Sequence, residues 1–169
     1  LGGRQPPLAY HYIVDYDGSV TTFHPEKMSA GHAGNHNAKS IGVSFVNIGY
    51  ARILNNKTDK RESTKTYLQS KGVSGTALEF VGPAKVGSEG SHAPRGGSVY
   101  WPKYPEAQWV AGAKLVAQIM SRWEVSPQNI YTHSYTDSGK FDVGAAFPLE
   151  EFKKKVAAQY TGPVAGSSS

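Results

Sequence analysis

The feature that most constrains the fold is a hairpin signal near the start of the chain. Residues 9–23 read AYHYIVDYDGSVTTF, in which two runs rich in β-branched and aromatic residues flank Asp17-Gly18. Glycine accepts the positive φ that a tight turn requires, so an Asp-Gly pair between such runs predicts a β-hairpin. We expect strands at about 9–15 and 19–23, joined by a turn at residues 16–19.

A loop and then a buried strand are predicted next. Residues 24–39, HPEKMSAGHAGNHNAK, have no hydrophobic period and contain three histidines, which favours a loop that lines a site. His32 and His36 have the spacing of a metal pair on a helix, but the neighbouring Gly and Asn residues argue against a helix. A substrate-contacting role for His32 is the better interpretation. Residues 40–48, SIGVSFVNI, are nearly continuously apolar and predict a central strand buried on both faces, with Ser44 as a packing residue.

Two amphipathic helices are predicted in the second half, at 105–123 and 148–160. Apolar and aromatic side chains recur there at spacings of three and four, which places them on one face against a core. The expected inward residues are Trp109, Ala113, Val116, Met120 and Trp123 in the first helix, and Leu149, Phe152, Val156 and Tyr160 in the second. The lysines at 153–155 are expected to be solvated.

Between these regions, residues 49–104 are rich in Gly, Ser, Lys and Asn. Such a composition predicts a long insertion with little regular structure, typical of a functional lid. Short elements at 66–68 or 77–81 are left open. With 169 residues, the chain predicts a single domain over 1–160 that contains this insertion, followed by a flexible Gly/Ser-rich tail at 161–169.

The strongest chemical signal is the stretch 130–147, IYTHSYTDSGKFDVGAAF. We expect a strand to end at residues 130–132, so that His133 opens a polar loop that folds back toward Asp142. Imidazole and carboxylate are both zinc ligands, and a catalytic zinc needs three protein ligands and one open position. Lys140 would then lie near a developing oxyanion. The alternative reading is a hydrogen-bonded structural histidine in an ordinary solvated loop.

Composition narrows the chemistry and the partners. There is no cysteine, so any zinc must be held by histidine and carboxylate. No apolar run approaches eighteen residues, which predicts a soluble globular protein without a membrane span. The net charge of +5 and pI near 9.3 favour anionic partners. Because no nucleic-acid-binding pattern is present, a cell-wall polymer is the better fit than nucleic acid.

These motifs, taken in order, resemble one enzyme family. AYHYIVDYDGSV, AGHAG, NAKSIGVSFVN, a Trp-containing helix and THSYTDSGKFDVGAAFP resemble the zinc-dependent N-acetylmuramoyl-L-alanine amidases, a family that includes phage amidase lysozymes and peptidoglycan recognition proteins. The resemblance covers about 9–48 and 105–152, with 49–104 as an enlarged insertion. It implies an α/β fold with a central mixed β-sheet flanked by helices, and a Zn²⁺ in a peptidoglycan-binding groove.

The implied activity is hydrolysis of the amide between N-acetylmuramic acid and the L-alanine of the stem peptide. Zinc would polarise the carbonyl and supply hydroxide. A bacteriolytic enzyme of this kind acts at the bacterial cell wall, whether it is secreted, periplasmic or delivered by a phage as an endolysin.

The resemblance also assigns residues. His133 and Asp142 match zinc ligands in the family's GHSD-like and KxD-like motifs, and Lys140 matches the basic residue that stabilises the oxyanion. Tyr10 matches the tyrosine of phage-type members and would orient or deprotonate the attacking water. His11 matches a hairpin histidine that is not a ligand.

Three further residues are expected to contact the substrate: His32, Asn35 and Ser44. Ser44 falls where many family members carry a catalytic glutamate, which phage-type members also lack.

One departure bears on activity. The family's first zinc ligand is a histidine in an HHT-like motif of an N-terminal strand, but only nine residues precede Tyr10 and none is histidine. The ligand lies outside this chain, another group replaces it, or the domain does not bind zinc. The rival function is therefore a catalytically inactive peptidoglycan-binding module. A structural virion or secretion-apparatus protein that borrowed the fold is a third reading.

Overall fold

Two compact units divide the chain between them in the computed structural model, which describes residues 10–31, 33, 39–54, 58–84, 99–137, 140 and 142–164. The first unit consists of segments from 1–45, 106–131 and 148–169. The second consists of 46–105 and 132–147.

The predicted hairpin forms in the first unit. Strand β1 (Tyr12–Val14) pairs antiparallel with β2 (Val20–Thr22), so the prediction is confirmed with shorter strands. Gly18 has φ +87° in the turn, and its amide donates to the Asp15 carbonyl at 2.9 Å. A side chain at Gly18 would also overlap the Ala107 carbonyl oxygen. Glycine is therefore required at this position for two reasons, its positive φ and the lack of space for a Cβ.

A third strand extends this sheet on the other side of β1. Strand β3 (Val43–Phe45) pairs parallel with β1, which gives the order β2-β1-β3 and a mixed sheet. A strand within the predicted range 40–48 is confirmed, but its predicted central position and its burial on both faces are wrong. Only three residues of that range are in a strand, all are half-buried, and β1 is the middle strand of the described sheet. Apolar composition predicted burial but not the strand order.

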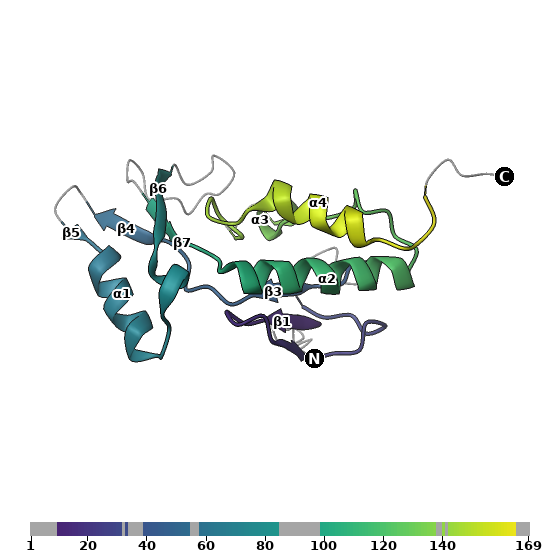
Figure 1. Ribbon diagram of the computed structural model, residues 1–169, viewed down its shortest axis with the longest axis horizontal. Coiled ribbons are helices and arrows are strands. Elements are labelled where there is room, and N and C mark those ends of the chain that lie inside the picture. Colours follow the sequence, from purple (N-terminus) through teal and green to yellow (C-terminus); the bar gives the residue numbers. More distant parts are fainter. Residues whose placement is uncertain are drawn as a thin grey trace, which may run out of the picture. The chain divides into compact units, whose positions relative to one another are not determined.

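Helix α2 (Glu106–Arg122) packs against β1 and β3, and α4 (Leu149–Gln159) packs against α2 (Figure 1). The buried side of α2 comprises Gln108, Gly112, Ala113, Ala117, Ile119 and Met120. Gly112 allows close approach, because a Cβ there would overlap the ring of Phe45. The Phe45 ring meets Phe152 of α4 edge to face, with centroids 5.7 Å apart.

Both predicted helices are therefore confirmed, and the mixed α/β class with them. After α4, the Thr161 amide donates to the Ser121 hydroxyl at 3.0 Å. Of the predicted flexible tail, residues 165–169 lie outside the described part of the chain.

Trp123, predicted to face the core, is instead 43% exposed. Its indole N–H donates to the carboxylate of Glu26 at 2.6 Å, as does the Tyr12 hydroxyl at 2.6 Å. The Arg122 guanidinium also forms an ion pair with the Glu26 carboxylate. Partial burial raises the pKa of Glu26, but these hydrogen bonds outweigh burial and lower it to about 2. Glu26 thus fastens the loop after β2 to β1 and to the end of α2.

The second unit contains an antiparallel sheet of order β5-β4-β7-β6. Its strands are β4 (Ala51–Leu54), β5 (Thr58–Asp59), β6 (Phe80–Ala84) and β7 (Val99–Pro102). Helix α1 (Arg61–Ser70) and the 3-10 turn η2 (Gly75–Leu78) lie between β5 and β6 in sequence. The prediction of little regular structure over 49–104 is therefore wrong. Short strands that pair with distant partners leave only a weak signal in the local sequence.

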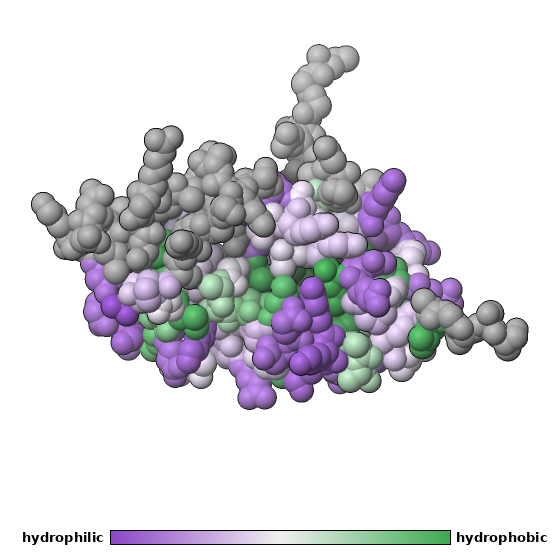
Figure 2. All heavy atoms as spheres, turned by 90° about the horizontal axis from the view of Figure 1, so that it is seen from above, coloured by the Kyte–Doolittle hydropathy of each residue, from purple (hydrophilic) through white to green (hydrophobic). Residues whose placement is uncertain are grey.

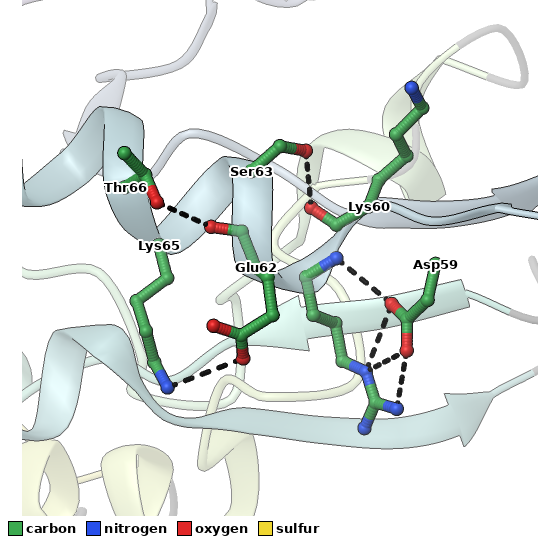
Figure 3. Close-up of polar contacts among 7 residues, drawn as sticks. Asp59, Lys60, Glu62, Ser63, Lys65 and Thr66 are labelled. Carbon is green, nitrogen blue, oxygen red and sulfur yellow. Dashed lines mark hydrogen bonds and ion pairs between the residues drawn. The ribbon is translucent and has the colours of Figure 1, made fainter.

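Helix α1 has a defined start and end. At the start, the Asp59 carboxylate accepts hydrogen bonds from the Arg61 amide at 2.9 Å and from the Arg61 Nε at 2.8 Å (Figure 3). At the end, Gly72 has φ +80°, its amide donates to Gln69 O, and the Val73 amide donates to Leu68 O. This is a Schellman motif, in which glycine accepts the left-handed conformation.

Hydrophilic and hydrophobic residues are interspersed on the face of the molecule shown in Figure 2. No helix among the residues described above is both long and apolar enough to cross a membrane.

Glu26→Gln tests the carboxylate that joins the loop, β1 and α2. A pKa lowered from 4.5 to about 2 by folding contributes stability that is present above pH 4.5 and lost as the pH falls toward 2. We expect the variant to lose about 1–2 kcal/mol of unfolding free energy at pH 7, since solvent screens the half-exposed Arg122. The difference from wild type should vanish near pH 2. Urea unfolding across this pH range measures it.

The matched control is Glu62→Gln, because that carboxylate is 84% exposed and lies 3.6 Å from Lys65. It should change stability by less than about 0.5 kcal/mol. Equal effects of the two substitutions at pH 7 would contradict the role of Glu26.

Candidate active site

The polar loop after residue 132 closes on itself within the second unit. The expected strand at 130–132 is not present, and His133 instead begins the short helix α3 (His133–Thr136). The Ser134 amide donates to the carbonyl of Asp142 at 3.1 Å, and the Lys140 amide donates to the carbonyl of Asp137 at 3.0 Å. These backbone bonds return the chain to its starting point, so the loop folds back as the sequence predicted.

The closed loop brings two predicted site residues into contact. His133 Nδ1 lies 2.9 Å from Asp142 Oδ2. The His133 side chain is 16% exposed and that of Asp142 is 50% exposed, so one edge of the pair is open to solvent. In a tetrahedral zinc site with bonds of about 2.0–2.2 Å, two donor atoms lie about 3.4 Å apart. If the two atoms moved apart by roughly half an ångström, they could both bind one zinc ion in such a site.

A second arrangement uses the same contact. With the proton on Nδ1, His133 donates a hydrogen bond to Asp142, and the unprotonated Nε2 is the atom that could bind a metal ion. The carboxylate then orients the imidazole, as second partners of metal-binding histidines commonly do. Both arrangements need an ionised Asp142.

The surroundings of Asp142 favour that ionised state. Partial burial raises the pKa of Asp142, but its hydrogen bond and electrostatic attraction to His133, with smaller contributions from the backbone and from Lys140, outweigh burial. The pKa of Asp142 is consequently below its ordinary value, and the carboxylate is charged at neutral pH. Metal ligands must be deprotonated, so the ionised carboxylate meets this requirement, and the imidazole meets it in its neutral form.

Lys140 is exposed and lies two residues before Asp142. Its ammonium group supplies positive charge to the neighbourhood of the carboxylate. This position is compatible with the predicted role of stabilising an oxyanion.

The segment 46–105 supports the loop from within the same unit. The Tyr104 hydroxyl donates to the carbonyl of Val143 at 2.8 Å, one residue beyond Asp142. The Tyr104 ring also meets Phe147 edge to face, with centroids 5.0 Å apart. These supporting residues were missed from the sequence, although the aromatic run VYWPKY at 99–104 is a strand signal.

A second contact fixes the same loop. Gly144 has φ +80°, and a Cβ there would overlap the indole of Trp101. Trp101 lies in β7 and is only 5% exposed. The indole therefore leaves room for backbone alone, and glycine is needed at 144.

Tyr10, His11 and Ser44 belong to the first unit. His11 is fully buried, with Nδ1 accepting from the Gly42 amide at 3.0 Å and Nε2 donating to the Met28 carbonyl at 2.7 Å. Both ring nitrogens are used, which agrees with the expectation that His11 is not a metal ligand. Tyr10 precedes β1, and Ser44 lies in β3 opposite Ile13.

Other predicted site residues lie outside the described part of the chain. These are His32 and Asn35, together with His36 of the weak metal pair. Among the residues with described positions, no group of three or more His, Cys, Asp or Glu could hold a metal ion. The fit to zinc is therefore partial, because the described residues provide two donors.

The chain matches a known protein family over most of its length. A family model described as N-acetylmuramoyl-L-alanine amidase matches residues 3–145. The matched range includes parts of both units and contains His133 and Asp142. No curated protein and no solved structure matches the chain.

Gly144→Ala tests the contact between the loop and Trp101. Alanine in the left-handed region costs about 1–2 kcal/mol, and overlap with the buried indole adds about 1–3 kcal/mol. Gly72→Ala is the matched control, because Gly72 has the same φ of +80° and no heavy atom within 4 Å of the added Cβ. Urea unfolding should show the larger loss for Gly144→Ala. Equal losses would mean that Trp101 does not constrain the loop.

Proposed function

The chain belongs to the N-acetylmuramoyl-L-alanine amidase family, and from this premise we propose that it is a peptidoglycan hydrolase. It cleaves the amide between the lactyl group of N-acetylmuramic acid and the L-alanine of the stem peptide. The observation that carries the proposal for this chain is the 2.9 Å contact between His133 and Asp142.

In the proposed reaction, water adds to the amide carbonyl carbon and the C–N bond then breaks. The products are a lactyl carboxylate and a free amino group on L-alanine, which takes up a proton. His133 and Asp142 would hold a Zn²⁺. When bound, the ion supplies Lewis acidity toward the carbonyl and acidifies water.

The chain's own residues have separate proposed tasks. Lys140 offsets negative charge on the carbonyl oxygen as it develops. Tyr10, assigned by family resemblance, orients the attacking water or accepts its proton. His32, Asn35 and Ser44 are proposed substrate contacts. The backbone hydrogen bond between Ser134 and Asp142 keeps the two proposed zinc ligands, His133 and Asp142, close together during the reaction.

Other proposals follow from the family. The predicted single amidase domain over 1–160 is retained as a proposal, and the family match through both units supports it. The proposed place of action is the bacterial cell wall. Secretion, periplasmic export and phage delivery as an endolysin are all compatible routes.

A second candidate function is a peptidoglycan-binding module without catalysis. The observation that favours it is the partial donor set, since the described residues give no third ligand beside the pair. Zinc content and turnover separate the candidates. Stoichiometric zinc with turnover supports the hydrolase, and wall binding without turnover supports the module.

The hydrolase proposal predicts the outcome of chelation and of two substitutions. A chelator, His133→Ala and Asp142→Asn should each reduce release of the free L-alanine amine from a soluble muramoyl peptide by about 100-fold or more. Chromatographic quantification of the amine measures this loss, and added Zn²⁺ should restore only the chelated wild type.

Asp137→Asn is the matched control, because it removes the same charge from the same loop. It should retain at least about half of the wild-type rate, because Asp137 is not one of the proposed ligands and asparagine keeps the size of the side chain. Activity that survives both chelation and His133→Ala would refute the proposed site.

A further inference from the structure

The positive charge of the chain is concentrated in one segment. Residues 46–105 contain nine Lys and Arg against four Asp and Glu, whereas the rest of the chain contains nine of each. The whole net charge of +5 therefore resides in the segment that also forms the sheet of the second unit. A localised positive field attracts polyanions more effectively than the same charge spread over the surface.

Within the described part of this segment, each carboxylate already has a basic partner. Asp59 pairs with Arg61, Glu62 with Lys65 and Glu79 with Lys103. Lys60 and Lys71 have no such carboxylate among the described residues, and both are exposed. Figure 3 shows the Lys60 side chain pointing away from Asp59 and Glu62. The uncompensated charge at α1 therefore comes from these two lysines.

Helix geometry places the two lysines on one side of α1. They flank the helix at its two ends, and eleven residues make about three turns, so they lie about 16 Å apart along the axis. Tyr67 lies on the same side and is 52% exposed, with Lys71 Nζ 5.6 Å from its ring centroid. Lys60, Tyr67 and Lys71 form an exposed cationic line with an aromatic ring, here called the basic stripe.

We propose that the basic stripe docks peptidoglycan through the free carboxylates of its stem peptides. This inference rests on the proposed function. The segment shares a compact unit with the His133–Asp142 pair, so an extended polymer cleaved there brings neighbouring stem peptides to the same unit. The lysines match their carboxylates in charge, and Tyr67 adds apolar contact area. No nucleic-acid-binding pattern accompanies the stripe, which favours the wall polymer over nucleic acid.

The test uses the full chain and a charge-matched pair of variants. Lys60→Glu/Lys71→Glu reverses the stripe, and Lys154→Glu/Lys155→Glu makes the same net change on α4. Each double variant includes one lysine above an aromatic ring, since Lys155 Nζ lies 5.8 Å from the Trp109 centroid. Binding is measured by co-sedimentation with purified sacculi stripped of phosphate-bearing polymers, at about 50 mM and about 300 mM salt.

The stripe variant should bind about five- to tenfold less than wild type at low salt, and the α4 variant less than about twofold less. Lys60→Gln/Lys71→Gln should give an intermediate loss, and it decides the matter if the glutamate variant fails to fold. Equal losses in the two charge-matched variants would overturn the proposal. So would wild-type binding that disappears when the phosphate-bearing polymers are removed, or a stripe variant that loses DNA binding while it retains sacculus binding.

A soluble muramoyl peptide separates this inference from the proposed function. Turnover of that substrate should be equal in wild type and in the stripe variants, because none of the stripe residues belongs to the proposed site. If neither the wild type nor the variants cleave the soluble muramoyl peptide, the hydrolase proposal fails. The docking proposal still stands in that case, provided that sacculus binding depends on the basic stripe.

Discussion

The closure of the loop between residues 133 and 142 is the constraint on which the candidate site depends. Among the described residues of this loop, the short helix α3 is the only regular element, so contacts outside regular structure maintain the shape of that part. The hydrogen bond from the Ser134 amide to the Asp142 carbonyl returns the chain, and the two side chains then meet at 2.9 Å. Outside the loop, Tyr104 holds the Val143 carbonyl and Trp101 packs on Gly144. A site built on a loop is made more definite by such supporting contacts.

This support gives the segment 46–105 more than one role. Its composition resembles that of a loose insertion, yet it forms a four-stranded sheet whose β7 supplies Trp101 and leads to Tyr104. It also carries the whole net charge of the chain. The residues proposed to take part in the chemistry therefore lie in the remainder, where positive and negative charges balance, and the charged segment contacts the loop that contains His133 and Asp142.

Local features were predicted well and long-range ones were not. The hairpin at Asp17-Gly18 and the two helices are encoded by turn residues and by periodicity within a few residues. By contrast, the apolar run at 40–48 predicted burial but not that β1 would be the middle strand. Trp123 fits an apolar period, but its indole N–H meets Glu26 from a loop 97 residues away. Periodicity predicts which side of a helix is apolar, but it carries no information about a polar partner that is distant in sequence.

The sequence by itself determined the kinds of group available: a histidine, a lysine and an aspartate close together, no thiol, and an excess of positive charge between residues 46 and 105. It also determined the elements whose contacts are short in sequence. Only the tertiary structure decided that Trp101 and Tyr104 brace the loop in which His133 and Asp142 touch, and that Glu26 holds Trp123. The reason is entropic. Contacts between residues that are distant in sequence cost loop-closure entropy, and local interactions do not offset this cost. Such contacts form only when the packing of the whole unit offsets it, so a local sequence pattern does not predict them.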